Sequence, residues 1–283
     1  MAEPEPEPEP EPDMQLDILL ENLTKVDAFT TLFQSLKSFS EHTNIQFDNE
    51  RMYIQTMDSA RISILEISLP TKWFCKYKCD VSVVLGINAS IIYKILSSKE
   101  KNQSIRLQYK SGGDKLNIHM CSPEGVSASG FDRHFEAPLM DIEDEYLNIP
   151  TIEYQMEMSL PSAIFSTMIH QLRGFGESLD IRCNEDNIRF TANTQESGSM
   201  SVDIRMDDLI EFSIEEGCQL DMSFGLQFLQ SVCSYSKISK TVNVKIHSEY
   251  PIRIEYPLYL IGQNTEVECG YIHFFLAPKI KDE

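Results

Sequence analysis

The sequence predicts an α+β protein built from two copies of one domain, each with more strands than helices. Short segments of alternating apolar residues, separated by turns, recur along the chain and indicate antiparallel strands. Each half also contains two segments with apolar residues at helical spacing. The elements follow one order in both halves at a nearly constant offset: Ile45 and Ile181 lie 136 residues apart, and Ile105 and Val242 lie 137 apart. Such repetition indicates a duplicated domain.

In the first half, a strand over residues 14–22 precedes a helix over 26–40. Val26, Phe29 and Phe33 fall on one face of this helix, which is therefore expected to pack on a sheet. A second helix is predicted over 87–96, with inward residues Ile87, Ile91, Ile92 and Ile95. The other segments alternate and are predicted strands: 44–47, 52–56, 61–69, 73–79, 104–109 and 115–120.

The second half repeats this order. A strand over 153–159 leads into a helix over 161–172, with Pro161 in its first turn and Gly174 beyond its end. A second helix is predicted over 224–233. The remaining predicted strands are 179–183, 187–192, 241–248 and 251–256.

A connector separates the halves. It carries carboxylates at Asp141, Glu143, Asp144 and Glu145 and a proline at Pro150, so we predict an extended surface segment. The N-terminal run MAEPEPEPEPEPD cannot bury apolar surface and is expected to be disordered, as a solubilising leader. The predicted organisation is a tail over 1–13, an N-terminal domain over 14–138, the connector over 139–156 and a C-terminal domain over 157–283.

The charge balance is strongly acidic. With 24 Lys plus Arg and 44 Asp plus Glu, the net charge is −20, which by itself argues against a nucleic-acid partner. An acidic outer surface can nevertheless coexist with a local basic stripe. We find no apolar run of membrane length and no signal sequence, so we expect a soluble, intracellular protein without membrane contact. Seven cysteines without a CxxC pair predict reduced thiols, no metal and no cofactor.

The predicted helices carry basic residues on their polar faces and almost no acids. If the two sheets join edge to edge, the four faces share one side of the molecule, which would then suit a polyanion. Ordinary solvated helix faces explain the pattern equally well, so both interpretations stay open on charge alone. The basic residues on or near these helices are Lys25, Lys37, Lys94, Lys99, Lys101, His170, Arg173, Lys237 and Lys240.

Several short strings are more specific. They are Met57-Asp58-Ser59 after the first hairpin, Leu139-Met140-Asp141 and Leu147-Asn148-Ile149-Pro150 in the connector, Leu160-Pro161-Ser162 at the third helix, and Leu276-Ala277-Pro278-Lys279-Ile280 near the C-terminus. In order and spacing, the chain over 14–283 resembles the proliferating cell nuclear antigen family, the eukaryotic DNA sliding clamps. The resemblance implies the DNA clamp fold: three two-domain subunits form a ring with helices lining the hole and antiparallel sheets outside.

The resemblance also implies a function. Such a ring encircles duplex DNA through sequence-independent phosphate contacts, here made by the basic residues named above, and serves as a processivity factor. Expected partners are double-stranded DNA, a clamp loader, a DNA polymerase and other PIP-box proteins of replication and repair. The expected location is the nucleus or the replication site of a DNA virus.

Two sets of site residues follow from the resemblance. Partner peptides in this family insert aromatic and aliphatic side chains into a pocket beneath the connector, although core or loop packing is the better explanation of each residue taken singly. Carried over, the pocket comprises Met57, Arg61, Ile64, Leu147, Ile149, Pro251, Phe275, Ala277 and Pro278. Ring closure would pair edge strand 133–137 with 199–204 of the next subunit, through Arg133, Phe135, Ala137, Met200, Val202 and Ile204.

The chain departs from the family pattern in several places. Helix positions that are basic in the family are neutral at Thr30, Thr31, Ser97, Thr167 and Ser234, which should weaken the grip on DNA. His170 replaces an arginine, Glu185 a modifiable lysine and Phe275 a tyrosine. These changes and the acidic tail suggest a divergent lineage, such as that of a DNA virus or a protist.

We predict no enzymatic activity. The chain lacks GxxxxGK[ST], GxSxG and HExxH strings, and its acid-rich segments 142–145 and 207–216 are interpreted as exposed loops rather than metal-binding clusters. The alternative to a homotrimeric clamp is a monomeric or hetero-oligomeric clamp-like processivity factor with weak DNA contact.

Overall fold

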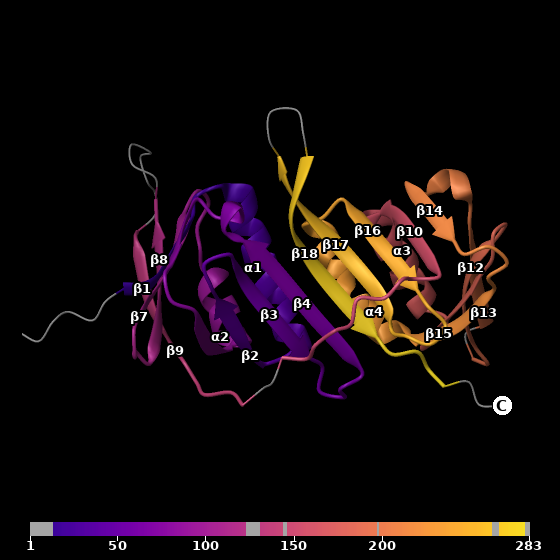
Figure 1. Cartoon of the computed structure of the whole chain (residues 1–283), viewed down its shortest axis with the longest axis horizontal. Helices are drawn as coiled ribbons and strands as arrows, with labels where there is room; N and C mark the ends of the chain where they lie inside the picture. Colours follow the sequence, from indigo (N-terminus) through magenta and orange to yellow (C-terminus); the bar gives the residue numbers. More distant parts are fainter. Residues whose placement is uncertain (1–13, 123–130, 144–145, 197, 262–265, 281–283) are drawn as a thin grey trace, which may run out of the picture.

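Both halves of the chain fold into the same succession of strands and helices in the computed structural model (Figure 1). The structure describes residues 14–122, 131–143, 146–196, 198–261 and 266–280. The predicted tail over 1–13 and the connector acids Asp144 and Glu145 lie outside these residues. Within them, antiparallel sheets dominate and four α-helices are present, which confirms the predicted α+β class.

The first half contains two helices among nine strands. Asn22 caps the first helix, because its side-chain oxygen accepts a hydrogen bond from the Lys25 amide at 3.2 Å. In chain order the elements are β1 (Met14–Leu20), α1 (Leu23–Phe39), β2 (His42–Phe47), β3 (Arg51–Met57), β4 (Ser63–Pro70), β5 (Lys76–Cys79), β6 (Val83–Asn88), α2 (Ala89–Leu96), β7 (Ser104–Lys110), β8 (Lys115–Cys121) and β9 (Arg133–Pro138).

The second half repeats these elements one for one. A 3₁₀ helix, η3 (Cys233–Lys237), extends its last helix. In chain order the elements are β10 (Met156–Pro161), α3 (Ser162–Arg173), β11 (Ser178–Cys183), β12 (Ile188–Thr194), β13 (Gly198–Ile204), β14 (Glu211–Ile214), β15 (Leu220–Gly225), α4 (Leu226–Val232), β16 (Thr241–Ile246), β17 (Ile252–Ile261) and β18 (Glu266–Leu276).

Strand pairing is duplicated as well. The first half forms the antiparallel orders β5-β1-β7-β8-β9 and β4-β3-β2-β6, and the second half forms β14-β10-β16-β17-β18 and β13-β12-β11-β15. β18 then pairs with β4, from Tyr271 opposite Ser68 to Leu276 opposite Ser63. This seam fuses five strands of the second half and four of the first into one sheet of nine.

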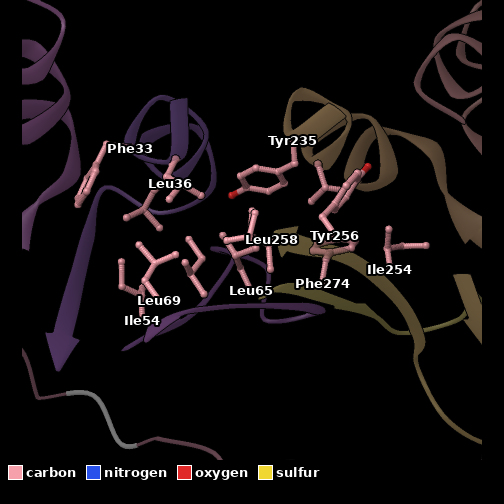
Figure 2. Packing of buried hydrophobic residues seen from close by; sticks show 14 of the residues in the cluster. Phe33, Leu36, Ile54, Leu65, Leu69, Tyr235, Ile254, Tyr256, Leu258 and Phe274 are labelled. Atoms are coloured by element: carbon pink, nitrogen blue, oxygen red, sulfur yellow. The ribbon is translucent and has the colours of Figure 1, made fainter. Parts of the chain in front are cut away.

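The helices cover one face of the nine-stranded sheet and share its apolar core (Figure 2). The hydroxyl oxygens of Ser35 on α1 and Ser234 on η3 lie 2.7 Å apart, so helices from the two halves touch. Buried apolar surface contributes roughly 25 cal/mol per Å², so a core that crosses the seam stabilises the two halves together. Its residues near the seam include Phe33, Leu36, Leu65, Tyr235 and Phe274.

The predicted helix over 87–96 begins too early. Residues 83–88 form strand β6, and α2 starts at Ala89, where the Asn88 side chain accepts a hydrogen bond from the Ile91 amide at 3.0 Å. Ile87 is therefore a buried strand residue, and Ile91 is 38% exposed rather than inward. The same error occurs at β15 and α4, because a buried strand that runs into a helix shows no break in its apolar pattern.

Two other predictions are corrected. The acid-rich segment over 207–216 is not all loop, because it contains β14, in which Phe212 pairs with Met158 of β10. The strand predicted over 73–79 shortens to β5, since Trp73 ends a 3₁₀ turn. Sequence reasoning also misses β18, although this strand forms the seam.

Candidate functional site

The connector crosses the outer face of the sheet, opposite the helices, in front of β4 and β18 (Figure 1). Several hydrogen bonds hold its described residues in place. The Met140 amide donates to the Gly86 carbonyl at 3.0 Å, and the Asn44 side-chain amide donates to the Ile142 carbonyl at 3.0 Å. Farther along, Gln55 bonds to the backbone of Leu147. The described connector is thus held against the sheet without forming a strand of its own.

Gly86 makes the first contact possible. A Cβ atom at this position would lie 2.1 Å from the Met140 carbonyl oxygen, so Gly86→Ala is expected to displace the connector. Hydrogen exchange of the Met140 amide should rise, because its bond to residue 86 is strained. Gly174→Ala is the matched control, since its Cβ would meet one atom at 3.2 Å with ordinary φ. Unchanged exchange at Met140 would contradict the close packing.

Two cavities flank the connector at Leu147, which lines both and is 44% exposed. The first cavity, of about 420 Å³, is also lined by Met57 and Arg61. The second, of about 340 Å³, is also lined by Ile149 and Phe275. The structure therefore brings five of the nine predicted pocket residues to two adjoining hollows.

The other four predicted pocket residues line neither cavity. Ile64 lies opposite Phe275 across the seam, and Ala277 follows β18 and donates its amide to the Ile62 carbonyl at 3.1 Å. Pro251 and Pro278 flank the ends of β17 and β18. These residues gather at one end of the seam beside the cavities rather than inside them.

Sequence reasoning misses two exposed apolar residues at this place. Ile62 is 40% exposed, and Tyr146 is 37% exposed with its ring centre 5.6 Å from that of Tyr53. A signal for Ile62 existed: it is an apolar residue three positions after the Met57-Asp58-Ser59 string, within a polar turn. Both residues enlarge the exposed apolar surface beside the cavities.

Asp58 orders the turn that forms one wall of the first cavity. Its carboxylate accepts backbone hydrogen bonds from Ala60 at 3.0 Å, Ile62 at 2.9 Å and Ser63 at 2.7 Å. Arg61 lies between them with a φ of 56°, a left-handed conformation that is uncommon outside glycine. The carboxylate thus compensates for a strained backbone and fixes the wall.

The floor of the second cavity is a row of polar side chains across the seam. The Tyr53 hydroxyl donates to Glu66 Oε1 at 2.5 Å, and His273 Nδ1 lies 3.5 Å from Glu66 Oε2. His273 Nε2 lies 3.4 Å from Glu255 Oε1. Burial acts to raise the pKa of Glu66, but hydrogen bonds from His273, Tyr53 and Gln55 outweigh it and lower that pKa. Glu66 is therefore a stable acceptor at neutral pH.

A similar balance makes the stabilising contribution of Glu255 depend on pH. Burial acts to raise its pKa, but the hydrogen bond from His273 and the charges of Arg253 and Lys245 lower it to about 2. The folded protein therefore favours the ionised form of Glu255. This preference adds about 3 kcal/mol to the free energy of unfolding above about pH 4.5, and the contribution is lost as the pH falls toward 2.

We therefore expect the free energy of unfolding of Glu255→Gln to fall less than that of wild type as the pH is lowered. Urea unfolding from pH 7 to pH 3 should show the variant less stable than wild type at pH 7, with the gap closing at low pH. Glu211→Gln, which alters an exposed residue of edge strand β14, is the control and should track wild type. A gap of constant size would contradict the role of Glu255.

The helix layer carries the predicted DNA-facing residues, several of which contact the protein itself. Lys25 donates to the Trp73 carbonyl at 2.7 Å and lies 5.7 Å from the centre of its ring. Lys99 pairs with Asp27 of α1 at 2.7 Å. Asp27 is the single acid in helices α1–α4 of the described chain, so this pair removes the one negative charge of that layer.

The remaining predicted residues differ in how available they are. Lys37 lies over the ring of Tyr93 at 4.1 Å, and Arg173 donates to the Gly176 carbonyl at 3.2 Å. His170 on α3 is exposed, with Nδ1 2.7 Å from the Ser166 carbonyl oxygen. The exposed lysines of the set are Lys37, Lys94, Lys101, Lys237 and Lys240.

Both strands predicted to meet between subunits lie at sheet edges. β9 ends the five-stranded sheet, with Ala137 buried and Phe135 half-buried, and Arg133 forms an ion pair with Glu100. β13 ends the four-stranded sheet, with its inward residues half-buried: Met200, Val202 and Ile204. Beside β13, a hollow of about 420 Å³ is lined by apolar residues that include Leu160, Ile164, Met168, Val202, Ile204 and Leu209.

In the part of the chain that the structure describes, no three His, Cys, Asp or Glu side chains gather as a metal ion would require, and no helix is long and apolar enough to span a bilayer. Four cysteines are buried, namely Cys79, Cys183, Cys233 and Cys269.

Comparisons with known proteins agree with this architecture. Residues 19–146 match the model for "Proliferating cell nuclear antigen, N-terminal domain", and residues 148–279 match the model for the C-terminal domain of the same family. The two matches meet inside the connector. The proliferating cell nuclear antigen of Chaetomium thermophilum is 27% identical over 271 residues, which cover 94% of this chain and 100% of the relative. The chain belongs to the proliferating cell nuclear antigen family.

Proposed function

We propose that the protein is a DNA sliding clamp that closes into a ring of three chains, encircles duplex DNA and tethers replication and repair proteins. The proposal rests on a strand joint that forms once within the chain and whose two counterpart strands are left at sheet edges. Within one chain, β18 pairs with β4. β9 and β13 hold the equivalent places in the other two sheets, and each is the last strand of its sheet in the described chain. A second copy can form the same joint there, and head-to-tail repetition closes a ring.

The internal joint also predicts the register of the external one. By position in the ladders, Phe135 is the counterpart of Phe274, and Met200 is the counterpart of Leu65. Phe274 pairs with Leu65 inside the chain. The same register would set Phe135 of one subunit opposite Met200 of the next, with the apolar hollow beside β13 buried by the joint.

The helix layer would line the hole of such a ring. With one acid in helices α1–α4, which Lys99 neutralises, this layer does not repel DNA phosphates as the acidic outer surface would. Because Lys25 and Lys99 contact the protein, phosphate contacts would fall mainly to exposed lysines such as Lys94, Lys101 and Lys237. A few such contacts give weak, sequence-independent binding that permits sliding.

The cavities at the connector would dock partner proteins. They lie on the outer face, away from the helix layer, and they combine exposed apolar residues with ordered polar walls. A PIP-box peptide of a polymerase or another partner, which presents aromatic and aliphatic anchors, suits such a surface. The protein would then act as a scaffold in the nucleus rather than as an enzyme.

Solution mass tests the ring. Light scattering at micromolar concentration should give one species with the mass of three chains of 32.4 kDa each. Loaded onto nicked circular DNA by a clamp loader, the ring should stay bound in high salt and slide off when the circle is cut. A single species at monomer mass would contradict the ring and favour the monomeric clamp-like alternative.

A further inference from the structure

The side-chain amide of Gln55 pairs with both backbone groups of Leu147. The Leu147 amide donates to Gln55 Oε1 at 2.6 Å, and Gln55 Nε2 donates to the Leu147 carbonyl at 3.0 Å. Among the described residues between Ile142 and Gln155, these are the bonds that tie the connector backbone to the sheet. Gln55 therefore sets where Leu147 stands between the two cavities.

Glu66 in turn fixes Gln55. Its Oε1 lies 3.3 Å from Gln55 Nε2 and also accepts the Tyr53 hydroxyl, which is 3.1 Å from the same nitrogen. An ionised carboxylate only accepts hydrogen bonds, so it selects the amide orientation in which Nε2 points toward Glu66 and Oε1 toward the Leu147 amide. The Glu66 side chain is 13% exposed, so water competes little for this contact.

We propose that Gln55 and Glu66 are positioning residues of the docking site, which hold the Leu147 wall of both cavities in place before a partner peptide arrives. The consequence for peptide binding rests on the proposed function, whereas the contact itself can be measured without a peptide. A wall held in advance removes an ordering cost from binding, so its release should weaken affinity beyond the loss of any direct contact with Gln55, which itself lines the first cavity.

Gln55→Met tests the contact, because methionine keeps the length of the side chain and loses both hydrogen bonds. Hydrogen exchange at the Leu147 amide should accelerate, and affinity for a synthetic PIP-box peptide should fall about tenfold. Gln46→Met on β2 is the matched control, since Gln46 lies on the same face of the neighbouring strand, opposite Tyr53, and leaves Leu147 untouched.

Gln55→Glu adds a readout that loss of packing would not give. At neutral pH the introduced carboxylate repels Glu66 and cannot donate to the Leu147 carbonyl, so binding should weaken as in Gln55→Met. Burial and Glu66 raise the pKa of the introduced group, so it takes up a proton as the pH is lowered and regains a donor. Among the described residues, the other titratable or charged groups that line the two cavities are Arg51, Tyr53, Asp58, Arg61, Glu143, Tyr154, Arg253, Tyr271 and His273.

The expected result is that the affinity of Gln55→Glu recovers toward that of wild type as the pH is lowered from neutral, while that of Gln55→Met does not. Equal peptide affinity of wild type and Gln55→Met would overturn the positioning role, as would a Gln55→Glu affinity without pH dependence. Failure of wild type itself to bind the peptide would instead refute the docking function, and exchange at Leu147 would still decide whether Gln55 holds the connector.

Discussion

Phe135→Asp is expected to separate the ring into monomers. Phe135 is half-buried on edge strand β9, and the proposed joint would set it opposite Met200 of the next subunit. A carboxylate there would be buried against apolar residues without a partner, at a cost of several kcal/mol per joint. Light scattering at micromolar concentration should report monomer mass. Val84→Asp on β6, another edge strand, alters a side chain that is 52% exposed and should leave the trimer intact.

A mixing experiment separates loss of the joint from loss of folding. Met200→Asp on β13 should also give monomers, because it damages the other half of the same joint. Each variant keeps one sound edge: Phe135→Asp keeps β13, and Met200→Asp keeps β9. Mixed in equal amounts, they should form a heterodimer with one joint and grow no further. If the mixture contains only monomers, the head-to-tail pairing is contradicted.

Much of the fold was predictable because its signals are local. Turn residues and apolar spacing mark most strands and all four helices, and the constant offset between Ile45 and Ile181 exposes the duplication. The errors lie where local signals run together. Ile87 and Phe224 belong to strands that lead directly into helices, so the apolar pattern continues across the boundary.

The seam and the site needed the three-dimensional structure. β18 pairs with β4 although about two hundred residues separate them along the sequence, and no local sequence pattern predicts which strand pairs with which over such a separation. The same holds for side chains: nothing near Lys25 indicates that it reaches Trp73, and nothing near Gln55 indicates that it holds Leu147. The resemblance to a family indicated the connector as the proposed docking region, whereas the presence of two cavities there depends on how the connector crosses the sheet.

Ile149→Asp is expected to abolish useful binding of a PIP-box peptide. Ile149 is half-buried in the connector and lines the second cavity together with Leu147 and Phe275. A carboxylate there would remove apolar contact and add negative charge above Glu66, in a protein whose connector is already acidic. Loss of one anchor position of this kind costs about 2 kcal/mol or more, which corresponds to roughly 30-fold weaker affinity in a fluorescence-anisotropy titration.

The control for this titration is Val81→Asp, which places the same charge on a side chain that is 65% exposed and lines neither cavity. It should bind the peptide like wild type. Both variants should remain trimeric, because residues 81 and 149 lie on neither strand of the proposed joint, β9 or β13, which are edge strands of the other two sheets. Equal binding by Ile149→Asp and wild type would exclude the second cavity as the docking site. Weak binding by an intact trimer would establish that tethering and ring closure depend on separate surfaces, as a clamp that exchanges partners while it stays on DNA requires.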